Sequence, residues 1–219
     1  CSNGLRFVQE IYCGREWCPI CGEDWSIPHK RRFARWLPKI EQMKSMGYFV
    51  FTIPMELRGK YRSKEALNTL AKAIAKGDKS KHLEGLLRGL GYKRGLRRWH
   101  FFGDKNSNYH PHLNVIVDGK KISQGKLAEI KRAYAELLGV DMAVVYYSYT
   151  RKPRKMVHIL KYVTRASFKE YNWDSELAEK LWGFRNNQCW GYKLWNKEKV
   201  WRMRSKEAKA LRKEFKEIG

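Results

Sequence analysis

The sequence predicts an α+β fold in which a mainly antiparallel sheet of about five strands is flanked by helices. Short segments rich in aromatic and β-branched residues alternate with longer stretches whose apolar residues recur at helical spacing. Two of the strands, 96–102 and 111–117, are separated by a polar loop, so they are expected to pair as a hairpin. The order strand, helices, strand, strand, helix, strand, helix favours an antiparallel sheet with the helices gathered on one side.

The first part of the chain predicts two helical regions around one strand. Apolar residues at helical spacing predict a helix over residues 30–46, ended by Gly47. The aromatic and β-branched run 48–54 predicts a buried strand. Ser63 is a suitable N-cap for a further helix, and a second helical stretch continues to Leu90.

The second part alternates strands and helices. Strands are expected over 96–102, 111–117 and 142–149, and helices over 124–138 and 154–169. The tail from residue 186 onward is rich in Trp and Lys and is expected to finish in a charged helix.

The charge balance predicts a polyanionic partner. The chain has 46 Lys and Arg against 22 Asp and Glu, a formal charge of +24. Nucleic acid is the commonest polyanion that such a surface attracts. A membrane is disfavoured, because no apolar run approaches the roughly 20 residues of a spanning helix and no signal peptide is evident.

Four of the five cysteines lie in the first 21 residues of the chain. Cys18 and Cys21 form a Cys-x-x-Cys pair, and with Cys1 and Cys13 they complete the four ligands that structural Zn²⁺ requires. His29 is an alternative to Cys1, and a set of reduced, partly buried thiols is the alternative to zinc. An odd cysteine count disfavours a secreted disulfide scaffold, so we expect an intracellular location. Because the chain starts with Cys rather than Met, we also expect residues ahead of it.

Three histidines predict a second metal site. His110 and His112 are two residues apart on an expected strand, so their side chains should share one face. His100 belongs to the preceding strand and can supply a third nitrogen if the two strands pair. Three histidines with open positions are typical of a catalytic cation rather than a structural one. The alternative is that these are ordinary surface or packed histidines.

The last expected helix carries a candidate nucleophile. His158, Tyr162 and Arg165 are spaced i, i+4 and i+7, which predicts one helix face. A tyrosine aimed at a phosphate can attack it when a cation is nearby, and Arg165 or Lys161 can neutralise the charge that develops on the phosphate. The alternative is that Tyr162 packs against the sheet with its hydroxyl in water.

Several of these segments resemble the motifs of HUH endonucleases, the superfamily of rolling-circle replication initiators and related transposases. The matching segments are HPHLNVIVDG at 110–119 (the HUH motif), YFVFTIP at 48–54 (the preceding strand motif), KYVTR at 161–165 (the tyrosine motif) and CGREWCPIC at 13–21 (a cysteine cluster of one plasmid branch). HFFG at 100–103 is similar to the rolling-circle transposase branch.

The resemblance implies a ferredoxin- or RRM-like fold and a divalent cation, Mn²⁺ or Mg²⁺, held by His110 and His112, with His100 as third ligand. It also implies that Tyr162 attacks a DNA phosphodiester to leave a 5′-phosphotyrosine and a free 3′-hydroxyl, and that reversal joins strands. The expected function is sequence-specific single-strand DNA nicking and joining for rolling-circle replication initiation. The alternatives are a transposase of the same chemistry, a metal nuclease that uses water, and a non-catalytic single-strand nucleic-acid-binding protein.

Two positions depart from the family pattern. His158 replaces a glutamate that often serves as base for a terminating water, and it can act as a base near neutral pH. Arg165 replaces the usual lysine and cannot release a proton.

The resemblance also sets expectations for organisation and partners. Residues 1–29 form a zinc-binding knuckle, 30–185 an HUH nuclease core, and 186–219 a basic helical extension packed on that core. The expected partner is single-stranded or hairpin DNA at a replication origin, with a host or fused helicase as a further candidate. We expect a cytoplasmic protein of a prokaryotic cell, encoded by a plasmid or virus.

Overall fold

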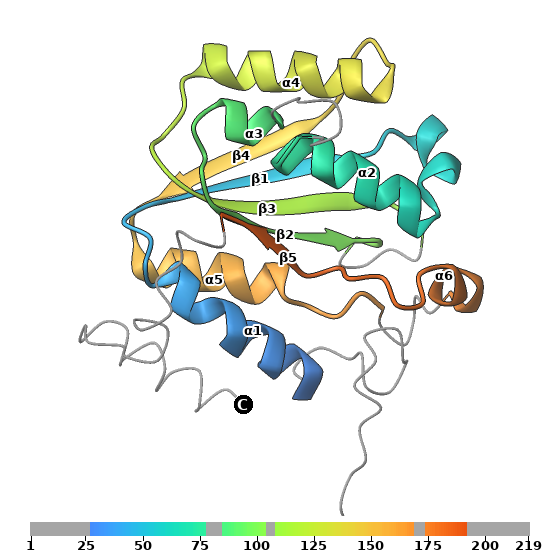
Figure 1. Ribbon diagram of the computed structural model, residues 1–219, viewed down its shortest axis with the longest axis horizontal. Helices are drawn as coiled ribbons and strands as arrows, with labels where there is room; N and C mark the ends of the chain where they lie inside the picture. Colours follow the sequence, from blue (N-terminus) through green and yellow to red (C-terminus); the bar gives the residue numbers. More distant parts are fainter. Residues whose placement is uncertain (1–26, 78–84, 104–107, 169–173, 192–219) are drawn as a thin grey trace, which may run out of the picture.

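A five-stranded antiparallel sheet in the order β4-β1-β3-β2-β5 forms the centre of the fold (Figure 1). The computed structural model describes residues 27–77, 85–103, 108–168 and 174–191. Within them the strands are β1 (Met46–Thr52), β2 (Gly95–His100), β3 (His112–Asp118), β4 (Val145–Thr150) and β5 (Gln188–Trp190). The α+β class and the five-stranded antiparallel sheet flanked by helices are therefore confirmed.

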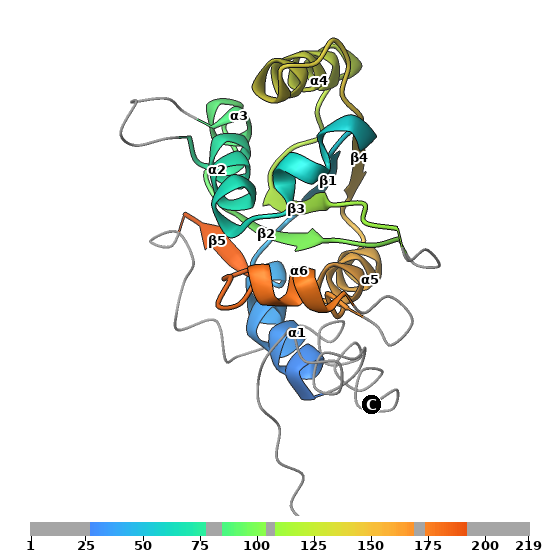
Figure 2. The same ribbon diagram turned by 90° about the vertical axis from the view of Figure 1, so that its right-hand side faces the viewer.

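Helices cover both faces of this sheet, so the expectation of helices on one side is wrong. The helices are α1 (Ile27–Ile40), α2 (Lys64–Ala75), α3 (Leu86–Gly89), α4 (Gln124–Leu138), α5 (Pro153–Val163) and α6 (Ser175–Lys180), with 3₁₀ turns at Met55–Leu57 and Gly59–Tyr61. Figures 1 and 2 show α1 and α5 side by side on one side of the sheet and α2, α3 and α4 on the other. Among the described residues, no helix is long and apolar enough to cross a membrane.

The central strands are apolar on both faces, which explains the two helical layers. On β3, Leu113 and Val115 are fully buried in a core shared with α2 and α4. Ile116 is also fully buried, but it faces the second core, which is built with Phe33 of α1 and Leu160 of α5. Because successive strand residues point to opposite faces, one run of apolar residues supplies both cores.

Capping residues set the limits of α2 and α4. The Ser63 hydroxyl accepts a hydrogen bond from the Ala66 amide at 3.2 Å, as expected of an N-cap. Ser123 does the same for α4, which ends before Gly139 in the left-handed conformation with φ of 72°. The expected bounds 124–138 are therefore confirmed.

Other expected bounds are shifted. The first helix runs through Pro38 and ends at Ile40, before the expected end at residue 46. Gly47 is thus not the end of that helix but the second residue of β1. A Cβ there would lie 2.9 Å from Cγ2 of Val117 on the neighbouring strand, so close strand packing is the reason for this glycine.

The tail contributes a strand that the sequence analysis does not predict. β5 pairs with β2, with Trp190 opposite Gly95. The Trp190 ring is 4% exposed, and its Nε1 donates to the carbonyl of Tyr92 at 2.9 Å. A Cβ on Gly95 would lie 2.2 Å from this ring. The indole therefore lies directly on the glycine and closes the β2 edge of the sheet.

We predict that Gly95→Ala destabilises the protein by about 1–3 kcal/mol, because the methyl group overpacks a ring whose N–H is already bonded. Urea or thermal unfolding measures this. Gly59→Ala is the matched control, because nothing lies within 4 Å of a Cβ at that position. Equal stability of the two variants would contradict the packing of Trp190 on β2.

Candidate active site

His100 and His112 face each other across the β2–β3 pair. His100 is the last residue of β2 and His112 the first of β3, and the register makes them direct partners. Their ring centroids are 5.4 Å apart, and each residue is 6% exposed. The predicted hairpin therefore brings two of the three expected histidines together.

His110 reaches the same place from outside the strand. The expectation that it lies on the strand with His112 is wrong, because β3 begins only at His112. Its amide still donates to the carbonyl of Phe101 at 2.7 Å, so the backbone remains hydrogen bonded to the chain that leaves β2. The rings of His110 and His112 are 5.5 Å apart. The three histidines thus form one cluster, with His112 in contact with both others.

Hydrogen bonds to carbonyl groups fix the protonation of two rings. Nδ1 of His112 lies 2.9 Å from the carbonyl oxygen of His110. Because a carbonyl oxygen only accepts, this nitrogen must carry the proton, and Nε2 retains a lone pair for a cation. In His100 the assignment is reversed, since Nε2 donates to the carbonyl of Val163 at 3.0 Å and leaves Nδ1 with the lone pair.

The three imidazoles are suitable ligands for a divalent cation, although they are not arranged as a complete metal site. Among the described residues, no group of three or more His, Cys, Asp and Glu side chains is arranged to hold a metal ion. Because Nε2 of His100 is bonded to the Val163 carbonyl, His100 can act as third ligand only through Nδ1.

The surroundings of His100 and His110 favour their neutral forms. Burial holds the pKa of His100 well below its usual value of 6.5, and the charges of His112 and Arg98 act in the same direction. Burial also lowers the pKa of His110, with Arg58 as a second cause. Neutral rings are the form that binds metal ions.

Tyr162 on α5 lies against this cluster. Its ring centroid is 5.2 Å from that of His100, and the guanidinium carbon of Arg165 lies 4.9 Å from the tyrosine ring. The expectation that Arg165 shares the helix face is wrong, because α5 ends at Val163 with Thr164 as C-cap. Arg165 reaches the ring from the segment that follows the helix.

The C-terminal end of α5 is held by α1. The Thr164 hydroxyl donates to the carbonyl of Leu160 at 2.8 Å, and Nε of Arg32 donates to the Thr164 carbonyl at 3.1 Å. Nε2 of His29, the alternative zinc ligand, is hydrogen bonded to the Thr164 hydroxyl at 3.3 Å. These bonds, together with that from His100 to Val163, fix the last turn of α5, on which Tyr162 lies.

Two other sets of expected site residues are not shown to join the cluster. His158, one turn before Tyr162 on α5, is exposed, and it is not among the rings that contact one another in the described part of the chain. Cys1, Cys13, Cys18 and Cys21 lie outside the described residues.

Sequence reasoning misses Arg98, which is fully buried on the same face as His100. Its Nη2 donates to the Arg165 carbonyl at 2.7 Å and to the Ser167 hydroxyl at 3.0 Å. It therefore holds the chain just after α5 in place. The alternation of a strand would have placed Arg98 beside His100, two residues away.

Comparisons with family models, with curated proteins and with solved structures found no match to this chain.

We predict that the metal-free protein loses stability as pH falls below about 6.5, by about 1.4 kcal/mol per pH unit for His100. Below that pH the unfolded chain binds a proton at this residue, whereas the folded protein, whose His100 pKa is well below 6.5, does not. Protons therefore favour unfolding.

Urea unfolding with a chelator between pH 7 and 5 measures how the free energy of unfolding changes with pH. His100→Phe should reduce this slope by the amount that one bound proton contributes. His158→Phe, at an exposed position, is the matched control and should keep the wild-type slope. An unchanged slope in His100→Phe would contradict the prediction.

Proposed function

We propose that this protein is a metal-dependent HUH-type endonuclease that nicks and joins single-stranded DNA to initiate rolling-circle replication. The observation that carries the proposal is the position of Tyr162, whose ring lies 5.2 Å from His100, which in turn faces His112. A packed aromatic residue of the core has no need of a histidine cluster beside it. A nucleic-acid-binding module has no need of one either.

Tyr162 supplies the nucleophile in this proposal. Its phenolic oxygen loses its proton to solvent and bonds to the phosphorus of a DNA phosphodiester. The bond from phosphorus to the 3′ oxygen breaks, and that oxygen takes up a proton as the 3′-hydroxyl. The 5′ end remains on Tyr162 as a phosphotyrosine, and attack by a 3′-hydroxyl reverses the step and joins the strands.

Arg165 and the three histidines make the phosphate easier to attack in this proposal. A divalent cation, Mn²⁺ or Mg²⁺, would be held by His110 and His112, with Nδ1 of His100 as third donor, and would draw electron density from the phosphate. Arg165, which lies over the Tyr162 ring, offers a permanent charge to the phosphate oxygens.

The expected DNA partner, helicase and zinc ion belong to the same proposal. The formal charge of +24 suits a DNA partner at a replication origin, and a host or fused helicase would open the duplex. A zinc ion on Cys1, Cys13, Cys18 and Cys21 would fold the knuckle that precedes α1.

The proposal predicts a protein–DNA adduct that depends on Tyr162. Wild-type protein, Mn²⁺ and a labelled pool of random-sequence single-stranded DNA should give a covalent band that survives SDS electrophoresis. Tyr162→Phe should lose it completely, because only the nucleophilic oxygen is removed. His112→Ala should lose the band while binding DNA nearly as well as wild type.

Tyr146→Phe is the matched control and should keep the adduct, since Tyr146 is an exposed tyrosine on β4. Cleavage that survives Tyr162→Phe would show that an activated water is the nucleophile. No cleavage with any divalent cation would leave a non-catalytic binding protein.

A row of residues that runs from the buried Asn114 to the exposed Tyr146 suggests the path of the DNA strand beside the histidines. Tyr146, Val50 and Asn114 form one row across β4, β1 and β3, and Thr52 and His112 form the next. At about 4.8 Å per strand, Tyr146 lies about 10 Å from Asn114 in the backbone. Its side chain is 63% exposed, so a base next to the bound phosphate can stack on it.

We predict that Tyr146→Ala weakens binding of single-stranded DNA roughly 5- to 100-fold, because one stacked base contributes about 1–3 kcal/mol. Tyr146→Phe should bind as wild type does, since it keeps the ring. Fluorescence anisotropy at several salt concentrations measures both. Leu137→Ala, at an exposed position on α4, is the control; an equal loss in that variant would contradict stacking at Tyr146.

A further inference from the structure

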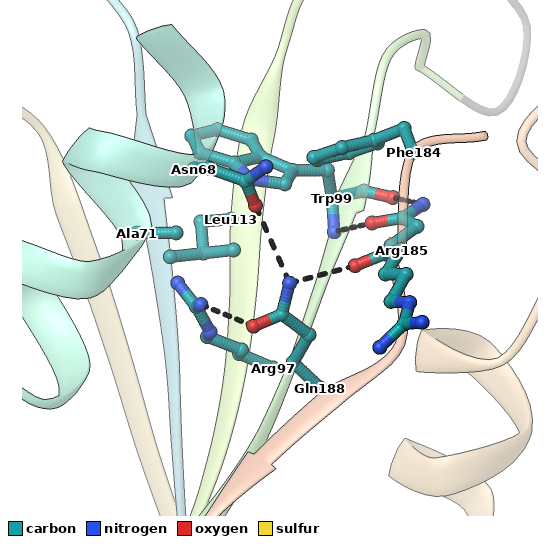
Figure 3. A pocket seen from close by; sticks show the side chains of 9 residues that line it. Asn68, Ala71, Arg97, Trp99, Leu113, Phe184, Arg185 and Gln188 are labelled. Carbon is teal, nitrogen blue, oxygen red and sulfur yellow. Dashed lines mark hydrogen bonds between the residues drawn. The ribbon is translucent and has the colours of Figure 1, made fainter. Parts of the chain in front are cut away.

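Two buried side chains on the opposite face of β2 carry hydrogen-bond donors into one pocket. Arg97 and Trp99 are 1% and 2% exposed, and both line a small pocket between α2 and the sheet (Figure 3). Asn68 of α2 and Gln188 of β5 complete its polar wall, and the exposed Arg185 also contributes to the lining. The pocket lies on the face of the sheet away from the histidine cluster.

The hydrogen bonds of this pocket leave donors without acceptors. Nη2 of Arg97 donates to Oε1 of Gln188 at 2.6 Å. The Gln188 amide nitrogen donates in turn to Oδ1 of Asn68 at 3.3 Å and to the carbonyl of Arg185 at 2.9 Å. In the described part of the chain, Nε and Nη1 of Arg97 and Nε1 of Trp99 find no partner. All three unpaired groups are N–H donors, so what this place lacks is an acceptor.

The pocket also lacks negative charge. Among the described residues Arg97 has no carboxylate partner, and burial alone lowers its pKa to about 10. A buried cation without a counter-charge is costly. The adjacent Arg98, on the other face, is also buried, but its Nη1 and Nη2 donate to Oδ1 of Asn187 at 2.9 Å and to the Arg165 carbonyl at 2.7 Å. Arg97 is therefore the buried arginine here for which an anion would supply both charge and acceptors.

We propose that this pocket is an anion site that binds a phosphate-class oxyanion, with Arg97 as its buried charge and the indole N–H of Trp99 as a further donor. A tetrahedral oxyanion fits better than a carboxylate, because the donors comprise two guanidinium positions, an indole and the nearby Arg185. One edge of the guanidinium, formed by the second N–H of Nη2 with either Nε or Nη1, binds two of its oxygens and leaves others for the remaining donors. The site is independent of the proposed nicking chemistry.

Entry of the ion requires a small movement of the lining. The side chains leave too little room for a bound ion as they stand. Arg185 is exposed and can turn outward. The ion is either free phosphate or the terminal phosphate of a nucleotide, since both present the same group.

Thermal unfolding in inorganic phosphate at constant ionic strength tests the site. Wild-type protein should show a saturable rise in Tm of about 2–6 °C by 20 mM phosphate, because a ligand that binds only the folded state stabilises it. Arg97→Met keeps the apolar stem, removes the charge, and should abolish the rise. Trp99→Phe removes the N–H together with part of the ring system and should reduce the rise. Tyr162→Phe should keep it in full, which separates this site from the nicking proposal.

Arg132→Met is the matched control, because it removes an exposed arginine on α4 and should leave the rise unchanged. Equal rises in Tm for wild type and Arg97→Met would overturn the proposal, since phosphate would then stabilise the protein through its overall positive charge and not through this pocket. If Arg97→Met does not fold, Arg185→Met and Trp99→Phe provide the comparison, and an undiminished rise in both overturns the proposal.

Calorimetric titration of wild type with phosphate should give about one site per chain, and no saturable binding would overturn the proposal. Titration with a nucleoside monophosphate then identifies the source. Binding of both ligands indicates that the site holds the phosphate end of a nucleotide, and binding of phosphate alone indicates a free ion. Either result supports the anion site.

Discussion

The hydrogen bond from Nε2 of His100 to the carbonyl of Val163 joins the sheet to α5, and the geometry of the candidate site depends on it. It selects the tautomer of His100 and orients its ring towards His112. It also satisfies a carbonyl in the last turn of α5, where the helix itself has no donor to offer. Because Tyr162 precedes Val163, the same bond sets the distance between the tyrosine and the histidines. This single contact thus positions both the tyrosine and the histidines of the site.

The two faces of the sheet differ in the polar groups that they bury. The α1–α5 face carries His100, Arg98 and Asn114 in the interior, and Oδ1 of Asn114 accepts from the Tyr48 hydroxyl at 2.5 Å. The opposite face is mainly aromatic and aliphatic, with Arg97 as an exception. Buried polar groups are retained at a cost in stability when function needs them. The first face thus holds the polar groups of the candidate site, whereas the second is mainly apolar packing apart from Arg97.

Much of the fold follows from local patterns, whereas the arrangement of the site does not. α4 could be predicted to its end residues because Ser123 and Gly139 mark its limits. β5 is three residues long and has no alternation to detect, so only its pairing with β2 defines it. The contact of His100 with His112 needed a strand register that spacing alone does not give. Arg165 was assigned to a helix face because nothing in the apolar pattern shows that α5 stops at Val163.

The position of β1 in the middle of the sheet has a consequence for how the chain must fold. β1 is made before its two sheet partners β3 and β4, so it has no sheet neighbour until β3, which ends at Asp118, has been synthesised. Its aromatic run is meanwhile an unpaired, aggregation-prone segment. Such long-range pairing slows folding. The order of synthesis therefore favours a chaperone, or early docking of α1, as protection for a nascent β1.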